Sequence, residues 1–341
     1  MEKILVTGGA GFIGSAFIRL LLSELPSCKV INLDSLTYAG NMDNLQGLDP
    51  VRHKFIHGDI TNSDDVMRAV TNDVDAIVNI AAESHVDRSI NSATDFLRTN
   101  IIGTQVLLDA ARTRRVKRFL QVSTDEVMGS LPENSSRVFT ESSPYAPNSP
   151  YAASKASAEH FVRAAHHTFG LDTVITRCGN NYGPRQFPEK FLPLMLANAM
   201  DDQSIPVYGD GLNIRDWIYV DDHCRAILSV LTKGKSGAMY NIGARNEQRN
   251  IDVARSVLDT LGKPHSLIQF VADRLGHDRR YAIDPTLIEN ELSWHPLETW
   301  QSGLTKTIEW YRNNKTWTER ARSGAYREYY KQQYGMDVKE K

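Results

Sequence analysis

Residues 7–15 read TGGAGFIGS and place Gly8, Gly11 and Gly14 directly after an apolar run at residues 4–6. An amphipathic pattern follows at residues 13–25. Glycines at this spacing permit a tight turn from strand to helix, and they let the backbone approach a pyrophosphate at the positive end of the helix. A glycine triplet alone is weak evidence, but its place between a strand and a helix is the context that a dinucleotide-binding turn requires.

Strand and helix patterns alternate through the first half of the chain. Short β-rich runs predict strands at residues 3–7, 29–33, 54–57, 76–80, 118–122 and 173–177. Helical patterns lie at residues 13–25, 63–70, 93–112 and 151–169. Such alternation is typical of βαβ units, in which helices cover both faces of a parallel sheet. We therefore predict an α/β protein with a Rossmann-type, doubly wound parallel sheet.

The character of the sequence changes after about residue 178, where loops such as YGPRQFPEKFLP (182–193) are rich in Pro and Gly. We predict a smaller C-terminal substrate-binding domain there. The dinucleotide-binding domain would comprise residues 1–178 with a returning segment near 212–242, and residues 179–335 would mainly bind the substrate.

Composition argues against several kinds of partner. The 341 residues carry a formal net charge of -2, so nothing indicates binding to nucleic acid or to an anionic membrane. The 3 cysteines are scattered without metal-ligand spacing, which predicts no metal site and fits a reducing compartment. No apolar run approaches the roughly 20 residues that span a bilayer. The chain opens on a predicted strand, which leaves no room for a signal peptide, so we expect a soluble cytoplasmic protein.

Asp34 indicates which dinucleotide the glycine turn would bind. It follows the second predicted strand, where a carboxylate accepts hydrogen bonds from an adenosine ribose and repels a 2′-phosphate, so we predict NAD rather than NADP. GDI at residues 58–60 and NIAAES at residues 79–84 follow the next two strands. Both fall at the carboxyl edge of the sheet, where ligands bind, although either could be ordinary strand-end packing.

Tyr151 and Lys155 lie four residues apart in SPYAASKASAEHF (149–161) and so share one face of a helix. A tyrosine is a poor base at neutral pH, but a nearby ammonium favours the phenolate and lowers the tyrosine pKa. The pair could then remove a hydroxyl proton during hydride transfer. An ordinary pair on a helix surface is the alternative, and the upstream glycine turn favours the catalytic interpretation.

With these motifs the chain resembles the extended short-chain dehydrogenase/reductase superfamily. The likeness runs from TGGAGFIG through YAASK to GHDRRYAID at residues 276–284. It implies a nicotinamide cofactor and a catalytic set of Thr124, Tyr151 and Lys155. Many members of this superfamily act on nucleotide sugars.

VSTDEVMGS at residues 122–130 places two adjacent carboxylates, Asp125 and Glu126, after a predicted strand. Taken alone, they could form a solvated acidic turn. In a site that oxidises C4 of a glucose ring, however, the 4-ketone would acidify the hydrogen on C5. Glu126 could abstract that proton while Asp125 protonates the departing C6 hydroxyl, provided that a desolvated site drives the two pKa values apart.

STDEV, AAESHVDRSI (81–90), NNYGP (180–184) and YGDG…RDW (208–217) make the chain similar to the dTDP-glucose 4,6-dehydratase family. The resemblance implies that Thr124, Asp125, Glu126, Tyr151 and Lys155 are catalytic. The cofactor contacts that it and the motifs imply are Gly8, Gly11, Phe12, Ile13, Gly14, Asp34, Thr37, Asp59, Ile60, Ala81, Ala82, Ser84, Thr99, Tyr151, Lys155 and Asn181. The implied contacts with dTDP-glucose are Ser84, Thr124, Asn180, Lys190, Phe191, Pro206, Tyr208, Arg215, Asn250 and His277.

One position departs from the family pattern, which usually has Tyr where this chain has Met128. Methionine can fill the space of an aromatic ring but offers no hydroxyl. We expect a neutral packing change, with an altered rate or substrate preference as the alternative.

Other functions fit part of the pattern. A nucleotide-sugar 4-epimerase would share the fold and the Tyr–Lys pair but generally lacks the acid pair, and a cofactor-sensing regulator would need none of the catalytic residues. Dehydration of UDP-glucose is a further alternative, because a methyl-sized difference is worth only about 1–3 kcal/mol in a pocket. The product could enter cell-wall polysaccharide or a secondary metabolite. The resemblance also implies a homodimer formed through the helices near residues 93–112 and 151–169.

Overall fold

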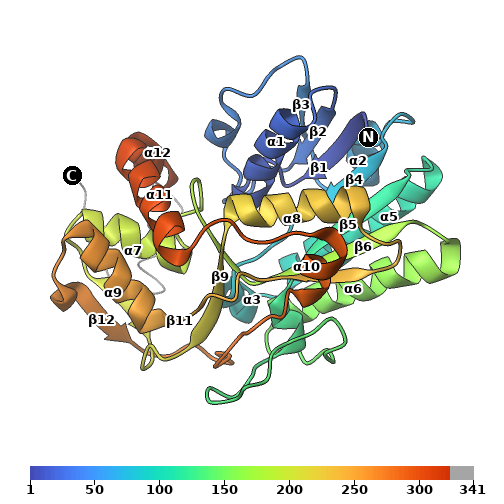
Figure 1. Cartoon of the computed structure of the whole chain (residues 1–341). Coiled ribbons are helices and arrows are strands. Elements are labelled where there is room, and N and C mark those ends of the chain that lie inside the picture. The colour runs from blue at the N-terminus through green and yellow to red at the C-terminus, as the bar shows by residue number, and fades with distance from the viewer. Residues whose placement is uncertain (323–341) are drawn as a thin grey trace.

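The computed structural model describes residues 1–322, which contain a parallel sheet of seven strands (Figure 1). The strand order is β10-β6-β5-β4-β1-β2-β3, and each neighbouring pair in it is parallel. The strands are β1 (Lys3–Thr7), β2 (Lys29–Asp34), β3 (His53–His57), β4 (Ala76–Asn79), β5 (Arg118–Thr124), β6 (Thr173–Cys178) and β10 (Met239–Ile242). Each strand predicted in the first half of the chain is present, and β10 joins the sheet from the segment expected to return to it.

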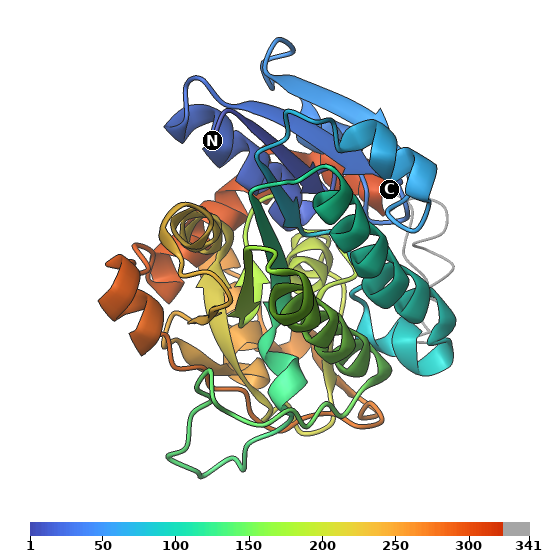
Figure 2. The ribbon, with the colours of Figure 1, turned by 90° about the vertical axis from the view of Figure 1, so that its right-hand side faces the viewer.

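Helices cover both faces of this sheet because successive strand residues are apolar on both sides. Ile4 and Val6 of β1 pack with α1, α8 and α10, whereas Leu5 between them packs with α2, α5 and α6. These helices are α1 (Phe12–Glu24), α8 (Val220–Lys233), α10 (Thr286–Leu292), α2 (Ser63–Ala69), α5 (Thr104–Thr113) and α6 (Pro150–Phe169). In Figure 2, α5 and α6 (teal and green) lie on one side of the sheet and α8 (yellow) on the other. The predicted doubly wound α/β fold is confirmed.

The helix predicted at residues 93–112 is interrupted. It consists of α4 (Thr94–Phe96), a π-helical segment η2 (Leu97–Gly103) and then α5. Within η2, the amide of Asn100 donates to the carbonyl oxygen of Glu83 at 3.0 Å and to Oγ of Ser154 at 2.8 Å. These bonds tie the segment to the loop after β4 and to α6. Wider turns of this kind occur often at functional sites, and here the turn carries Thr99 to the cofactor cavity described below.

The C-terminal part has two small sheets and its own apolar cluster. One sheet contains β7 (Asn180–Tyr182), β9 (Ile214–Tyr219) and β11 (Glu247–Arg249), and the other contains β8 (Ile205–Tyr208) and β12 (Ile268–Val271). Tyr182, Trp217 and Leu304 belong to the cluster that packs these strands against helices. The helices are α7 (Phe191–Met200), α9 (Asn250–Leu261), α11 (Trp300–Asn313) and α12 (Lys315–Ala321).

The predicted division into two domains is mirrored in this layout, but its boundaries stay a prediction. Of the returning segment near residues 212–242, α8 and β10 join the large sheet and its helices, whereas β9 belongs to a small sheet. Residues 323–335 of the predicted second domain lie outside the described residues. The remaining short helices are α3 (Val86–Asn91), η1 (Met42–Leu45), η3 (Asp125–Met128) and η4 (His265–Leu267).

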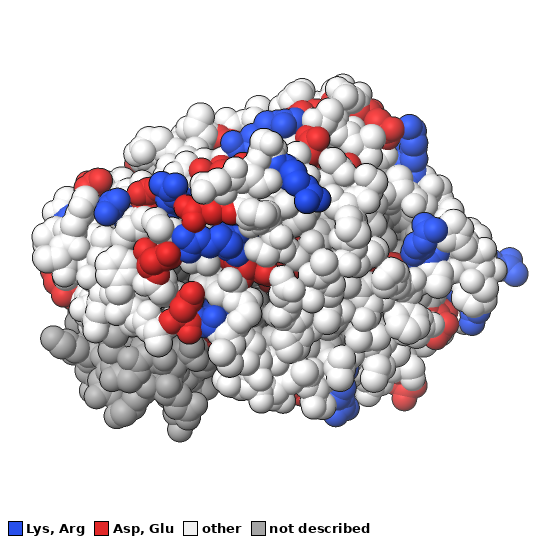
Figure 3. Space-filling model, turned by 90° about the horizontal axis from the view of Figure 1, so that it is seen from below, with Lys and Arg blue, Asp and Glu red and all other residues white. Residues whose placement is uncertain are grey.

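Charged side chains on the face seen from below are intermixed rather than gathered by sign (Figure 3). Ion pairs between described side chains include Arg279 with Glu133 at 2.7 Å and Arg245 with Glu289 at 2.8 Å. Among the described helices, none is both long and apolar enough to cross a membrane.

Candidate active site

A cavity opens at the carboxyl ends of β1, β2, β4 and β5, beside the glycine turn. The strand order reverses between β1 and β4, and ligands of open α/β sheets bind at such a switch point. Every residue predicted to contact the cofactor lines this cavity: Gly8, Gly11, Phe12, Ile13, Gly14, Asp34, Thr37, Asp59, Ile60, Ala81, Ala82, Ser84, Thr99, Tyr151, Lys155 and Asn181. The structure thus brings the predicted set together, while the contact of each residue with a cofactor stays a prediction.

The glycine turn fits a group that must approach its backbone closely. A Cβ on Gly14 would lie 2.2 Å from the carbonyl oxygen of Gly8, so only glycine lets α1 start this close to the turn. The residue that precedes α1, Gly11, gives the helix no side-chain cap. The first N–H groups of α1 are therefore available to an anion such as a pyrophosphate.

Asp34 fixes the edge of the cavity at the end of β2. Its carboxylate accepts hydrogen bonds from the N–H groups of Ala10 and Leu36, each at 2.8 Å. Burial raises the pKa of this carboxyl, and the two backbone donors oppose that shift. Asp34 thereby joins the glycine turn to the loop after β2, at the position where an adenosine ribose would lie. This edge and the uncapped helix together fit a dinucleotide.

The acid pair lies on the 3₁₀ turn η3, directly after β5. Oγ1 of Thr124 accepts a hydrogen bond from the N–H of Glu126 and donates to Oδ1 of Asp125, each at 3.3 Å. Asp125 is buried and Glu126 is half-buried, so the pair is no solvated turn. Burial, with the negative charges of Glu126 and Asp216, holds the pKa of Asp125 well above its usual range. Burial also raises the pKa of Glu126, but the positive charge of Arg215 opposes it.

Tyr151 and Lys155 lie on α6 with both side chains buried. Nζ of Lys155 donates to the carbonyl oxygen of Val122 on β5 at 2.7 Å, and burial lowers the pKa of Lys155 to about 8. Burial and the negative charge of Glu126 hold the pKa of Tyr151 well above its usual range, although a hydrogen bond with Thr124 opposes this. The lowered pKa that was expected for Tyr151 beside Lys155 is therefore not found in this structure, because burial outweighs the other influences on that pKa.

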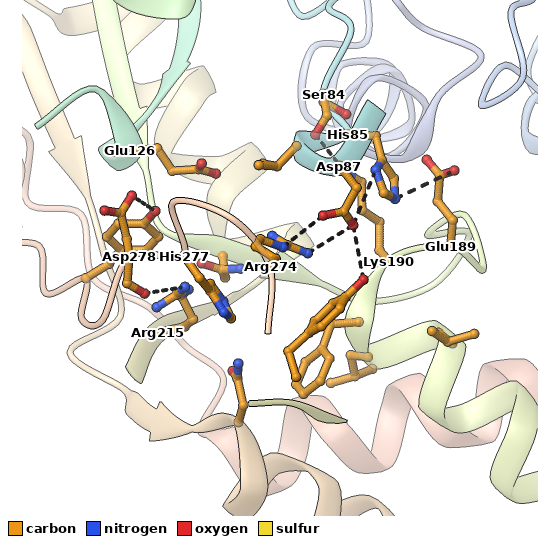
Figure 4. Close-up of a pocket in the computed structure, with 18 of the residues that line it drawn as sticks. Ser84, His85, Asp87, Glu126, Glu189, Lys190, Arg215, Arg274, His277 and Asp278 are labelled. Carbon is orange, nitrogen blue, oxygen red and sulfur yellow. Dashed lines mark hydrogen bonds and ion pairs between the residues drawn. The ribbon is translucent and has the colours of Figure 1, made fainter. Parts of the chain in front are cut away.

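A second cavity adjoins the first and extends into the C-terminal part (Figure 4). Except for Thr124, which lines the cofactor cavity, the residues predicted to contact substrate line this one: Ser84, Asn180, Lys190, Phe191, Pro206, Tyr208, Arg215, Asn250 and His277. Ser84, Glu126, Asn180 and Lys190 line both cavities. Glu126 therefore lies where a bound cofactor and a bound substrate would meet.

A network of charged groups in this second cavity was not predicted. Nε of Arg274 pairs with Oδ1 of Asp87 at 2.9 Å, and the hydroxyl of Tyr208 lies 3.4 Å from Oδ2 of Asp87 (Figure 4). His85 lies between two carboxylates, 3.9 Å from Asp87 and 3.9 Å from Glu189. The stretch AAESHVDRSI could have indicated His85 and Asp87, since it supported the family resemblance. No local pattern indicates Arg274, which lies on a loop.

Arg215 is held in place by backbone and ring contacts. Its Nη2 donates to the carbonyl oxygen of Asp278 at 2.9 Å, and its guanidinium lies 4.2 Å from the ring centre of Tyr281. Nδ1 of His277 lies 2.6 Å from Oδ1 of Asp273, and burial lowers the pKa of His277 to about 4. Arg215 thus presents an oriented guanidinium to the cavity, and His277 presents an imidazole that is neutral near neutral pH.

Known proteins resemble this chain over nearly its whole length. The family model described as GDP-mannose 4,6 dehydratase matches residues 5–307. The dTDP-glucose 4,6-dehydratase of Shigella flexneri is 48% identical over 97% of this chain and 99% of that protein. The crystal structure of the dTDP-glucose 4,6-dehydratase from Streptomyces venezuelae, with NAD and TYD bound, is 51% identical, has a TM-score of 0.90, and covers 94% of this chain and 99% of its own. The chain belongs to the dTDP-glucose 4,6-dehydratase family.

The family resemblance predicted from the motifs is confirmed, and the rival family is more distant. The UDP-glucose 4-epimerase of Thermus thermophilus, solved in complex with NAD, is 29% identical with a TM-score of 0.85, over 92% of this chain and 99% of its own. The fold is shared by both families, so the fold alone does not separate them. The difference in sequence identity separates the two families, and it agrees with the presence of the acid pair Asp125 and Glu126.

Met128, where the family usually has Tyr, is 3% exposed and belongs to a small apolar cluster. Its neighbours there include Val127, Tyr281 and Ile283. It does not line either cavity described above. Its position favours the packing interpretation over a direct effect on substrate.

Proposed function

We propose that this protein is an NAD-dependent dTDP-glucose 4,6-dehydratase, a hydro-lyase that converts dTDP-glucose into dTDP-4-keto-6-deoxy-glucose. One observation carries the proposal: Glu126 of the acid pair lines both cavities, and Tyr151 lies beside it in the cofactor cavity. Support comes from the relatives, which bear this activity in their names, and from the Streptomyces enzyme, which was solved with NAD.

Oxidation at C4 requires a base for the hydroxyl proton. Bound NAD supplies the hydride acceptor for C4 and, later, the hydride donor for C6. Tyr151 takes the proton of the C4 hydroxyl as a phenolate and becomes the neutral phenol, and the hydrogen bond with Thr124 favours the phenolate that must be present beforehand. Lys155 adds a positive charge near it, held in position by its bond to Val122. The raised pKa of Tyr151 means that this proton transfer awaits bound cofactor and substrate.

Elimination of water requires a base and an acid on neighbouring carbons. Glu126 takes the proton from C5, which the adjacent ketone has made acidic, and returns a proton to C5 when the hydride is delivered to C6. Asp125 gives its proton to the C6 hydroxyl, which leaves as water. The electrostatics support this assignment, because Asp125 keeps its proton to higher pH than an ordinary carboxyl, and Arg215 favours the charged form of Glu126.

The nucleotide would lie in the second cavity. Arg215 suits the diphosphate, because a guanidinium fork matches phosphate oxygens and here it is already oriented. Lys190, whose Nζ donates to the carbonyl oxygen of Ser84 at 2.7 Å, adds positive charge where the two cavities meet. In this proposal, residues 1–178 with the returning segment bind NAD, and residues 179–335 mainly bind the nucleotide sugar.

We further propose a homodimer in the cytoplasm. Large apolar side chains are exposed along η2 and α6, with exposed fractions of 49% for Leu97, 52% for Ile102, 43% for Phe161 and 54% for Phe169. Two such helices from each protomer would bury these side chains in a four-helix bundle. A reducing compartment is compatible with the cysteines, which are free and buried.

Mass spectrometry of dTDP-glucose incubated with the purified protein tests the activity. We expect the sugar nucleotide to lose one water, and dTDP-glucose to react faster than UDP-glucose. The Glu126→Gln variant should lower the rate at least about a hundredfold, because it removes a positioned base. Its NAD content should equal that of the wild type, since Gln has nearly the same volume.

Two outcomes would overturn the proposal. An unchanged mass with a C4 epimer as product would identify a 4-epimerase. Full dehydratase activity in Glu126→Gln would remove Glu126 from the C5 step. The matched variant Asp125→Asn separates the roles of the pair, because it should allow exchange of the C5 hydrogen with solvent while blocking loss of water.

A further inference from the structure

Two aromatic side chains from distant loops meet at the cofactor cavity. Tyr38 lies on the loop after β2 and Phe187 on the loop after β7, and both line the cavity. Their ring centres are 5.7 Å apart with an edge-to-face arrangement. Both side chains are half-buried, so they lie between the cavity and solvent. This contact closes one side of the cofactor cavity.

A salt bridge connects the ring of Tyr38 to the loop that carries Phe187. The guanidinium of Arg88, on α3, lies 3.9 Å from the ring centre of Tyr38. Its Nη2 also pairs with Oε2 of Glu189 at 3.1 Å. Glu189 is buried and lies two residues after Phe187. The four side chains therefore form one connected group, the aromatic clasp: Tyr38, Arg88, Phe187 and Glu189.

Each half of the aromatic clasp is anchored to a different part of the protein. The loop after β2 is tied to the glycine turn, since the N–H of Asn41 donates to the carbonyl oxygen of Ala10 at 3.0 Å. The loop after β7 is tied to the C-terminal helix α11, since the hydroxyl of Tyr311 donates to the carbonyl oxygen of Gln186 at 2.5 Å. Opening the clasp would separate contacts between these two parts.

We propose that the aromatic clasp retains NAD in its cavity between turnovers. The inference rests on the proposed function, in which the cofactor ends each cycle in its starting oxidation state and need not leave. Neither Tyr38 nor Phe187 takes part in the proton transfers described above. They act as retaining residues, and their loss should affect release of NAD rather than the chemistry.

The NAD content of the purified protein after gel filtration, and the rate at which NAD leaves, test the inference. Tyr38→Ala removes the edge-to-face contact and the contact with Arg88, so we expect NAD to leave about ten- to a hundredfold faster. Phe187→Leu should have a smaller effect in the same direction. Tyr38→Phe keeps the ring and should restore most of the retention. Phe270→Ala is the matched control, because Phe270 is 56% exposed on β12 and lines neither cavity.

Activity with added NAD distinguishes retention from damage to the site. In Tyr38→Ala, saturating NAD should restore kcat to within about threefold, whereas the apparent KM for NAD rises with the release rate. Wild-type retention of NAD in both Tyr38→Ala and Phe187→Leu would overturn the inference. A wild-type protein that retains NAD but does not dehydrate dTDP-glucose would instead contradict the proposed function, and the two failures are thus distinct.

Discussion

The two cavities of the active site are built in different ways. In the cofactor cavity, Gly8, Asp34, Ala81 and Thr124 lie at or just after the ends of β1, β2, β4 and β5, so the sheet itself sets their positions. In the substrate cavity, side chains come from segments far apart in the sequence. There Arg274 meets Asp87 and Arg215 meets the backbone of Asp278, so contacts between the lining residues set the positions.

This difference has a physical cause. The carboxyl ends of parallel strands meet at one edge of a sheet, which makes such residues neighbours in every fold of this type. Loops lack the regular geometry of a sheet. Buried polar side chains on them must therefore form hydrogen bonds and ion pairs with one another until a ligand binds. We therefore expect the cofactor cavity to be sensitive to backbone space and the substrate cavity to be sensitive to side-chain charge.

Substitution of Gly14 by Ala should have the largest effect. The new Cβ would lie 2.2 Å from the carbonyl oxygen of Gly8, and the turn would have to shift. We expect NAD binding and activity to fall at least about a hundredfold, as measured by NAD titration. Alanine has a higher helix propensity than glycine, which by itself would raise the stability of the folded protein. Unchanged NAD affinity would show that backbone space does not limit the cofactor cavity.

Substitution of Arg215 by Lys should affect only the substrate cavity. Lysine keeps the charge but loses the planar fork that contacts Asp278 and Tyr281. We expect KM for dTDP-glucose to rise about tenfold while NAD content stays unchanged. Arg249→Lys is the matched control, because Arg249 lies on the neighbouring strand β11, is exposed and pairs only loosely with Glu133 at 3.5 Å. A loss of NAD in Arg215→Lys would contradict the separation of the two cavities.

The pH dependence of kcat should report on Lys155. Its pKa is lowered to about 8, so the side chain is charged at neutral pH and loses its proton as the pH rises through that value. If the charge assists Tyr151, kcat should fall about tenfold per pH unit above the transition. Lys155→Arg should move this limb to higher pH, because a guanidinium keeps its charge. A profile that is flat to about pH 10, near the ordinary pKa of a lysine, would remove Lys155 from the oxidation step.

Substitution of Met128 by Tyr, the residue usual in the family, should have the smallest effect on activity. Met128 is buried in an apolar cluster and lines neither cavity, so we expect kcat to change less than about threefold. The larger ring should instead lower the Tm, because a packed core resists added volume. Thermal unfolding and initial rates measure the two effects. A large gain in kcat would mean that a hydroxyl at this position supports the site.

The fold and most of the residues of the cofactor cavity were predictable from the sequence alone. The alternation of strand and helix patterns predicted the parallel sheet. The residues that follow its strands are neighbours for that reason alone, as Asp34 and Ala81 illustrate. The acid pair was also visible, because Asp125 and Glu126 directly follow β5. The family motifs identified substrate residues such as Arg215 and His277 by resemblance, without indicating what holds them.

Long-range packing sets which charges meet and how deeply they are buried. It pairs Asp87 with Arg274, which are 187 residues apart, and it brings Tyr38 against Phe187. It also decided the protonation of Tyr151, whose pKa burial raises although the sequence places a lysine one helical turn away. Local sequence fixes neighbours along a strand or a helix, whereas desolvation and long-range ion pairs depend on everything that packs around a group.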